Sequence, residues 1–298
     1  MEWLLALAFL FGLMQDAQVN YEEAALAAFA ALEQQETAMY ADYETAKQSI
    51  SSEWTVFPEV VSQGDAVMVR ASEQHSVEWN GATYELLPFG TGFYAILPVP
   101  IEMEAGTYQV GESTVTVVKK SFKTQQLKVT EEQEGMKRNT KRIQADREKV
   151  LSARSLSESS FLFQDLFVIP LDNARLTTPY GFTRYTNGVY SGRHRAIDLA
   201  APQGTPIAAA AAGKVTLSEE LYLTGNTIYI DHGMGLFSEY AHLSELLVEP
   251  GEVVEAGQTI GLVGTTGFST GPHLHFAFWI HNVQTNPDIF FDSSPFRW

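Results

Sequence analysis

Short runs of alternating apolar and polar residues follow one another from Trp54 to about Val129. Runs such as DAVMVRAS and STVTVV repeat with a period of two, and Gly and Pro separate them. Successive side chains of a strand point to opposite faces, so this pattern predicts half-buried strands joined by turns. We therefore expect a small β-sandwich with antiparallel strands over residues 53–129.

A second strand-rich region extends over residues 161–298. Gly-containing turns such as PYGFTR, AAGKV and EPGEVVEAGQ separate its apolar runs. In the run HLHFAFWI, the large apolar side chains Leu274, Phe276, Phe278 and Ile280 recur at every second position, which predicts one face packed into a core. The chain as a whole is therefore expected to be mainly β.

Three other segments have helical or targeting patterns. Residues 20–49 contain no Gly or Pro and are rich in Ala, Glu and Gln, which favours a helical segment over residues 19–52. Residues 130–160 carry many charges of both signs, and we expect a charged helical linker there. The apolar run WLLALAFLFGLM is too short to span a bilayer and indicates a signal peptide over residues 1–18, although Glu2 replaces the usual basic residues; the alternative is a buried N-terminal helix.

Charge and composition restrict the classes of function. The chain has 298 residues, a formal net charge of -17 and no cysteine. The acidic balance disfavours binding to nucleic acid or to anionic lipid, because both would repel the protein. The absence of cysteine excludes disulfides, thiolate metal sites and a cysteine nucleophile. Any metal site must therefore use His, Asp and Glu.

Histidines and one aspartate supply the candidate chemistry. His273 and His275 in GPHLHF are two residues apart and would share one face of a strand. His194 and Asp198 in GRHRAIDLA are four apart, so a loop entering the strand IDLA is needed to bring them together. In SEYAHLSEL, His242 is expected to share a strand face with Tyr240.

These motifs together resemble a known family. The segments HRAID, YAHL and GPHLH stand in the order found in zinc metallopeptidases of the lysostaphin and LytM type, which cut bacterial peptidoglycan. Connectors such as TTPYGFTR and TGNTIYIDHG are similar as well, and the resemblance covers roughly residues 165–290. One position departs from the pattern, because Ala196 stands where the family usually has glycine. The resemblance implies an antiparallel two-sheet LytM-type peptidase domain, preceded here by the small β-sandwich and the helical segments.

The resemblance also implies roles for individual residues. It makes His194, Asp198 and His275 ligands of one Zn²⁺ per chain, a three-ligand set that leaves a fourth position open for water. His242 and His273 would be catalytic groups beside the metal, and which of them is the general base stays open. Possible substrate-binding residues are Arg184, Asn226 and Tyr240, with a buried core position as the alternative for Tyr240.

The expected function is that of a zinc-dependent metalloendopeptidase that hydrolyses amide bonds in peptidoglycan stem peptides or cross-links. Such a protein would be exported, with the periplasm favoured over the cell surface, and would not stay inserted in the membrane after signal removal. The alternative is a non-catalytic wall-binding module or a regulator of a cell-wall amidase, which the complete ligand set disfavours. A further hypothesis is that the sandwich or the segment 20–49 covers the groove and keeps the peptidase latent.

Overall fold

A computed structural model describes residues 54–90, 92–155, 157–163 and 167–291. The chain divides into two compact units, residues 1–53 and residues 54–298, and the described residues belong to the second. The predicted signal peptide over residues 1–18 and the helical segment over residues 19–52 lie outside the described residues. Among those that are described, no helix has both the length and the apolar character that crossing a bilayer requires.

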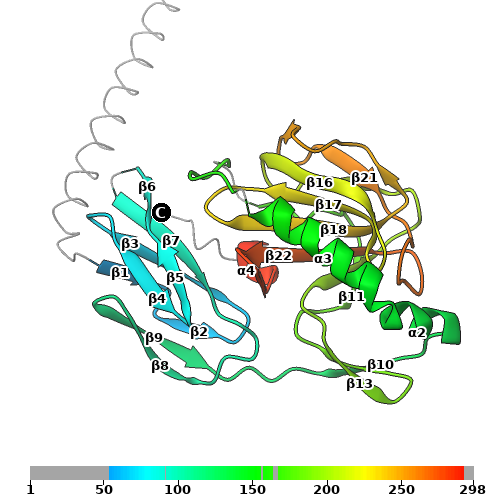
Figure 1. Cartoon of the computed structure of the whole chain (residues 1–298), viewed down its shortest axis with the longest axis horizontal. Coiled ribbons are helices and arrows are strands. Elements are labelled where there is room, and N and C mark those ends of the chain that lie inside the picture. The colour runs from blue at the N-terminus through cyan, green and yellow to red at the C-terminus, as the bar shows by residue number, and fades with distance from the viewer. Residues whose placement is uncertain (1–53, 91, 156, 164–166, 292–298) are drawn as a thin grey trace, which may run out of the picture. The chain divides into compact units, whose positions relative to one another are not determined.

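Short strands fill the first described region, where the sequence predicts a sandwich (Figure 1). They form three sheets with the orders β1-β3-β7-β6, β2-β9-β8 and β4-β5 around a shared apolar core that includes Val67, Trp79 and Leu97. One pair, β2 with β9, is parallel, whereas alternation alone predicted antiparallel neighbours. The strands are β1 (Trp54–Phe57), β2 (Val60–Ser62), β3 (Ala66–Ala71), β4 (Ser76–Trp79), β5 (Ala82–Glu85), β6 (Leu87–Phe89), β7 (Gly92–Pro98), β8 (Gly106–Val110) and β9 (Ser113–Val118).

The charged segment that follows forms two helices, α2 (Glu131–Arg138) and α3 (Thr140–Arg154), preceded by the short strand β10 (Thr124–Leu127). Helix α2 begins with a capping box, in which the Thr130 hydroxyl accepts from the Gln133 amide and the Gln133 side chain accepts from the Thr130 amide. Asn139 ends α2 and caps α3, so the charged segment is broken there.

Helix α3 packs against the sheet of the second region. Its Val150 and Ala153 contact a cluster formed by Leu217, Leu221 and Tyr229. Figure 1 shows α3 crossing in front of strands β16 to β18. The predicted linker helix is therefore part of a packed layer.

An eight-stranded sheet dominates the second region. Its order is β11-β14-β22-β18-β17-β16-β20, with β23 also paired to β22, and its neighbouring strands are antiparallel. A small sheet β15-β21-β19 lies beside it, and β12 and β13 form a hairpin that β10 extends in parallel. The elements are β11 (Arg175–Thr178), β12 (Thr183–Thr186), β13 (Val189–Arg193), β14 (Ile197–Ala200), β15 (Pro206–Ala208), β16 (Gly213–Leu221), β17 (Gly225–Asp231), β18 (Leu236–Leu243), β19 (Glu245–Leu246), β20 (Val253–Val254), β21 (Thr259–Leu262), β22 (Leu274–Ile280), β23 (Val283–Thr285) and α4 (Asp288–Phe291).

Strand β22 separates a core from a groove. Leu274, Phe276, Phe278 and Ile280 are fully buried in the main core of the region, as the alternation predicted. The intervening His275 lies on the opposite face, because side chains alternate along the strand. The mainly β architecture is confirmed, and the core fixes the strand that carries the candidate chemistry.

Candidate metal centre

Three donor atoms converge at the edge of the groove. Asp198 on β14 and His275 on β22 are direct cross-strand partners, so their side chains share a face. Nδ1 of His275 lies 2.8 Å from Oδ1 of Asp198. His194 follows β13 and brings its Nε2 to 2.9 Å from the same carboxylate oxygen and to 3.3 Å from Nδ1 of His275. The loop between β13 and β14 thus joins the two residues that the sequence spaces four apart.

This arrangement fits a single metal ion of the zinc type. Donor atoms about 2.0–2.2 Å from a tetrahedral zinc are separated from one another by roughly 3.3–3.5 Å. The two imidazole nitrogens have this separation, 3.3 Å, and the carboxylate oxygen lies somewhat nearer to them, at 2.8 and 2.9 Å. Two imidazoles and one carboxylate are also ligands that zinc prefers. His194 and Asp198 are buried, and His275 is half-buried on the groove side. The backbone at Ala196 does not have a positive φ, so the glycine usual at that position is not needed here.

A β-bulge places His242 in the groove. On β17, Asn226 pairs with Leu243 and Ile228 pairs with Tyr240, so Ala241 and His242 lie opposite the single residue between them. His242 has a φ of 66°, in the left-handed region. The extra residue breaks the alternation and turns His242 to the face that carries His275.

The same bulge overturns one expectation. Strict alternation placed Tyr240 and His242 on one face, but Tyr240 pairs with Phe276 on the core side and is fully buried. Its hydroxyl accepts from the amide of Ala210 at 2.7 Å and lies 3.0 Å from Oγ of Ser238. Tyr240 is a core residue, and the prediction that it binds substrate is corrected.

Backbone carbonyls orient His242 and His273. Nδ1 of His242 lies 2.8 Å from the carbonyl oxygen of Thr266, and Nδ1 of His273 lies 2.8 Å from that of Gly271. A carbonyl oxygen only accepts, so each Nδ1 carries the hydrogen and each neutral ring has its lone pair on Nε2. Nε2 of His273 is 3.8 Å from Oδ1 of Asp198. Both rings are therefore oriented beside the three donors.

Burial keeps the imidazoles of His194 and His242 neutral. It lowers the pKa of His194 to about 4, although the hydrogen bond with Asp198 acts in the other direction. Burial, with the nearby His275 and His273, lowers the pKa of His242 to about 3. Burial alone would raise the pKa of Asp198, but its hydrogen bonds with His194 and His275 outweigh that effect and hold it well below its ordinary value. Near neutral pH these groups have the protonation states that bind metal and accept protons.

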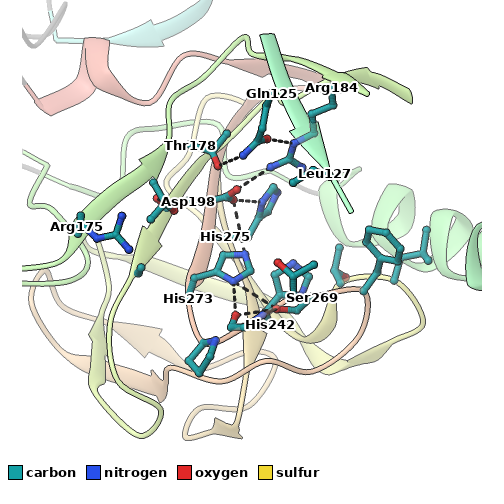
Figure 2. Close-up of a pocket in the computed structure, with 18 of the residues that line it drawn as sticks. Gln125, Leu127, Arg175, Thr178, Arg184, Asp198, His242, Ser269, His273 and His275 are labelled. Atoms are coloured by element: carbon teal, nitrogen blue, oxygen red, sulfur yellow. Dashed lines mark hydrogen bonds and ion pairs between the residues drawn. The ribbon is translucent and has the colours of Figure 1, made fainter. Parts of the chain in front are cut away.

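Arg184 holds the second oxygen of the central carboxylate. Its Nη2 donates to Oδ2 of Asp198 at 2.7 Å, and its Nε donates to Oε1 of Gln125 at 2.9 Å. Gln125 in turn donates to the hydroxyl of Thr178 at 2.9 Å. In Figure 2 His242 and His273 lie on one side of Asp198, and Arg184 and Gln125 lie on the other. Arg184 thus supports the candidate metal ligand, and because it also lines the cavity, its predicted contact with substrate stays a prediction.

Gln125 has no local sequence signal. It lies on β10, and only the parallel pairing of β10 with β12 brings it beside Arg184. A pairing between strands so distant along the chain cannot be read from alternation. Gln125 is therefore a site residue that sequence reasoning missed.

The groove contains a cavity of about 480 Å³ beside the donors. Its lining includes Arg184, Asp198, His242, His273 and His275, together with Gln125, Leu127, Lys137, Arg175, Thr177, Thr178, Ala200, Leu223, Thr224, Phe268, Ser269, Thr270, Gly271 and Pro272. Asn226 does not belong to this lining, and its side chain donates to the carbonyl of Ser244 at 3.4 Å. The structure gives no support to its predicted contact with substrate. No residue of strands β1 to β9 lines this cavity either, so it gives no support to a sandwich that covers the groove.

Comparison with known proteins places this region in a family. The model of Peptidase family M23 matches residues 192–287, which include all five candidate metal and catalytic residues. Residues 192–287 form an M23 peptidase domain. Among curated proteins, the domain is similar to the peptidoglycan DD-endopeptidase ShyC of Vibrio cholerae serotype O1, with 47% identity over 94 residues. It is also similar to the DD-carboxypeptidase/endopeptidase Mpg of Neisseria meningitidis serogroup B, with 41% identity over 118 residues.

These matches are confined to part of each protein. The match to ShyC covers 32% of this chain and 22% of that protein, and the match to Mpg covers 40% and 27%. A solved structure of a putative peptidase M23 from Pseudomonas aeruginosa extends beyond the M23 domain, with a TM-score of 0.60 and 26% identity over 78% of this chain and 95% of that one. The similarity in fold therefore includes regions that precede the M23 domain.

Proposed function

We propose that the protein is a zinc-dependent metalloendopeptidase that hydrolyses amide bonds in peptidoglycan stem peptides or cross-links, with one Zn²⁺ per chain. The observation that carries the proposal is the convergence of two imidazole nitrogens and one carboxylate oxygen, separated by 2.8 to 3.3 Å, on an open groove. The M23 domain and the names of its relatives, which act on peptidoglycan, support the substrate class.

His194 would hold the metal through Nε2, His275 through Nδ1 and Asp198 through Oδ1. A zinc ion held by these residues would supply Lewis-acid chemistry to the scissile carbonyl and to the attacking water. The hydrogen bond from Arg184 occupies Oδ2 of Asp198 and leaves Oδ1 facing the two imidazoles.

His242 and His273 would move protons and stabilise charge. Their Nδ1 atoms are fixed on carbonyl oxygens, so each Nε2 is free to accept a proton and, once protonated, to donate to a developing oxyanion or to the leaving amine. The groove location of both rings gives them access to a bound peptide. General acid and base roles are assigned to this pair.

The proposed substrate implies export, because peptidoglycan lies outside the cytoplasmic membrane. The apolar run at residues 3–14 supports a signal peptide, and the periplasm is the compartment we propose.

The full chain should contain zinc near one ion per chain and release peptides from purified peptidoglycan, identified by mass spectrometry. His273→Ala should keep the metal and lower product formation by about 10²–10⁴-fold, because it removes a proton-transfer group. His194→Ala should lose the metal as well, because it removes a ligand. Bound zinc without any released product would contradict the proposal and favour a non-catalytic regulator.

A further inference from the structure

Helix α2, which precedes the M23 domain, contributes Lys137 to the lining of the groove cavity. Nε2 of Gln133 donates to the carbonyl oxygen of Ser269 at 2.9 Å, which joins α2 to the loop preceding His273. The capping box at Thr130 and Gln133 and the hydrogen bond to Ser269 both fix the first turn of α2. Lys137 lies in the last turn of this helix and reaches the groove from there.

The side chain of Lys137 is held in position at the cavity. Its Nζ lies 4.5 Å from the centroid of the Phe268 ring and 3.3 Å from the hydroxyl of Thr186. Thr186 is buried, and its hydroxyl also donates to Ser191, so it is a fixed partner. Neither neighbour carries a negative charge.

The cavity has an excess of positive charge in an otherwise acidic protein. Its lining contains the cations Lys137, Arg175 and Arg184 but only one carboxylate, that of Asp198. Arg184 is bound to Asp198, whereas Lys137 and Arg175 form no ion pair with any described residue. Because the net charge is -17, this concentration of cations favours an anionic group at the groove itself.

The side chain of Lys137 is fixed more firmly than that of Arg175, so Lys137 is the better candidate to bind an anionic group. The hydroxyl and the aromatic ring keep its ammonium at the cavity, so little side-chain entropy is lost when an anion binds. Partial burial and the nearby Arg184 lower the pKa of Lys137, although Glu134 on the same helix acts in the other direction, and an incoming carboxylate would offset the net lowering. Both side chains are exposed, but unlike Lys137, Arg175 makes no side-chain hydrogen bond or ring contact with another described residue.

We propose that Lys137 is a specificity-determining residue that binds a free carboxylate of the peptide in the groove. The inference rests on the proposed peptidase function for its choice of ligand. The carboxylate is either the α-carboxylate at the end of a stem peptide or the side-chain carboxylate of its diamino acid. Both present the same planar anion to the ammonium group.

The test uses three matched stem peptides and the full zinc-loaded chain. One peptide keeps both carboxylates, the second has a C-terminal carboxamide, and the third has a carboxamide on the diamino acid. We expect one of the two carboxamides to lower kcat/KM about tenfold, mostly through KM, because one charge-assisted contact is lost. The carboxamide that has this effect identifies the source of the carboxylate.

Substitution of Lys137 tests whether it is the partner of that carboxylate. Lys137→Ala should lower kcat/KM about tenfold on the peptide with both carboxylates and cause no further loss on the sensitive carboxamide, as a double-mutant cycle requires. Lys137→Arg should recover part of the loss. Lys141→Ala removes a nearby exposed cation that does not line the cavity and should leave all three peptides unaffected.

Peptide binding by calorimetry separates this inference from the proposed function. Binding that weakens with the same carboxamide and with Lys137→Ala, in a protein that cleaves nothing, would support the carboxylate contact and overturn the peptidase. Equal effects of Lys137→Ala on all three peptides, in cleavage and in binding, would overturn the contact.

Discussion

At the scale of single residues, the candidate metal site depends on side chains beyond the three donors. Gln125 holds Arg184, and Arg184 holds Oδ2 of Asp198, so the carboxylate is oriented through two hydrogen bonds. Groups that orient metal ligands are typically important for metal affinity although they do not touch the metal. Gln125 is therefore a positioning residue.

Gln125→Ala should weaken zinc binding about tenfold or more, since outer partners of ligands contribute about 10- to 100-fold to affinity. Competition with a chelator measures this directly. Gln126→Ala is a matched control, because it removes the exposed neighbouring amide on the same strand. If both variants bound zinc as the native chain does, the positioning role would be wrong.

His232 should make stability depend on pH. It is fully buried, with Nδ1 2.8 Å from the carbonyl of Ala212 and Nε2 2.8 Å from the hydroxyl of Ser238, which is a structural role. Burial lowers its pKa from the ordinary 6.5 to about 4. Below pH 6.5 the unfolded chain takes up a proton that the folded chain does not, so stability is present above that pH and is lost as the pH falls toward 4.

Between about pH 7 and about pH 5, the free energy of unfolding of the native chain should fall by about 2 kcal/mol more than that of His232→Gln. Denaturant unfolding at both pH values measures this difference. The comparison between the two proteins cancels the titration of the other histidines. Gln can donate to Ala212 and accept from Ser238, so both hydrogen bonds can persist. Parallel pH profiles for the two proteins would contradict this role for His232.

The limits of sequence reasoning are visible at the same scale. Alternation identified the core face of β22 and placed His275 on the opposite face, because side chains along a regular strand have a fixed period. It placed Tyr240 with His242 because nothing local announces the bulge opposite Thr227. The motif still placed His242 beside the metal donors, but the β-bulge, and not regular alternation, turns its side chain to that face.

At the scale of elements, the capping box offers a direct way to change the stability of α2, the helix that carries Lys137. Thr130→Ala removes the hydroxyl of the capping box and should destabilise the helix by about 1 kcal/mol. Amides of α2 should then exchange with deuterium about fivefold faster, a factor that corresponds to that energy.

Exchange in α3 should be unchanged in this variant, because Asn139 caps α3 separately. Thr140→Ala, which alters the first residue of α3 without touching a cap, serves as the control. Unchanged exchange in α2 of Thr130→Ala would show that the capping box does not limit opening of the helix.

The sequence indicated the helical character of the segment 130–160, since charged residues with few breakers favour helix. It did not indicate that α2 and β10 supply groove residues. Their places depend on pairing with β12 and on contact with the loop before His273, both of which are long-range. The division of residues 53–298 into separate domains stays a prediction.

At the scale of the whole molecule, the fold should survive removal of the metal. The main core is made of buried apolar residues of the sheet and does not include the donors. Chelation should therefore lower Tm by about 5–10 °C, the shift that corresponds to about 2–3 kcal/mol of binding free energy in a chain of this size.

Far-ultraviolet circular dichroism should keep its strand signal after chelation, and added zinc should restore Tm. Cooperative unfolding on chelation at room temperature would instead show that the metal is required for folding.

The residues that β10 and α2 contribute to the groove would be lost if only the family domain were grafted into a related protein. Gln125 and Lys137 precede residue 192, where the match to the M23 domain begins. A transplant of residues 192–287 alone would carry the metal donors into a new host but leave behind the glutamine that supports them and the lysine proposed to select substrate. The segment that would have to be moved to keep the proposed activity is therefore longer than the family domain and includes β10 from Thr124 onward.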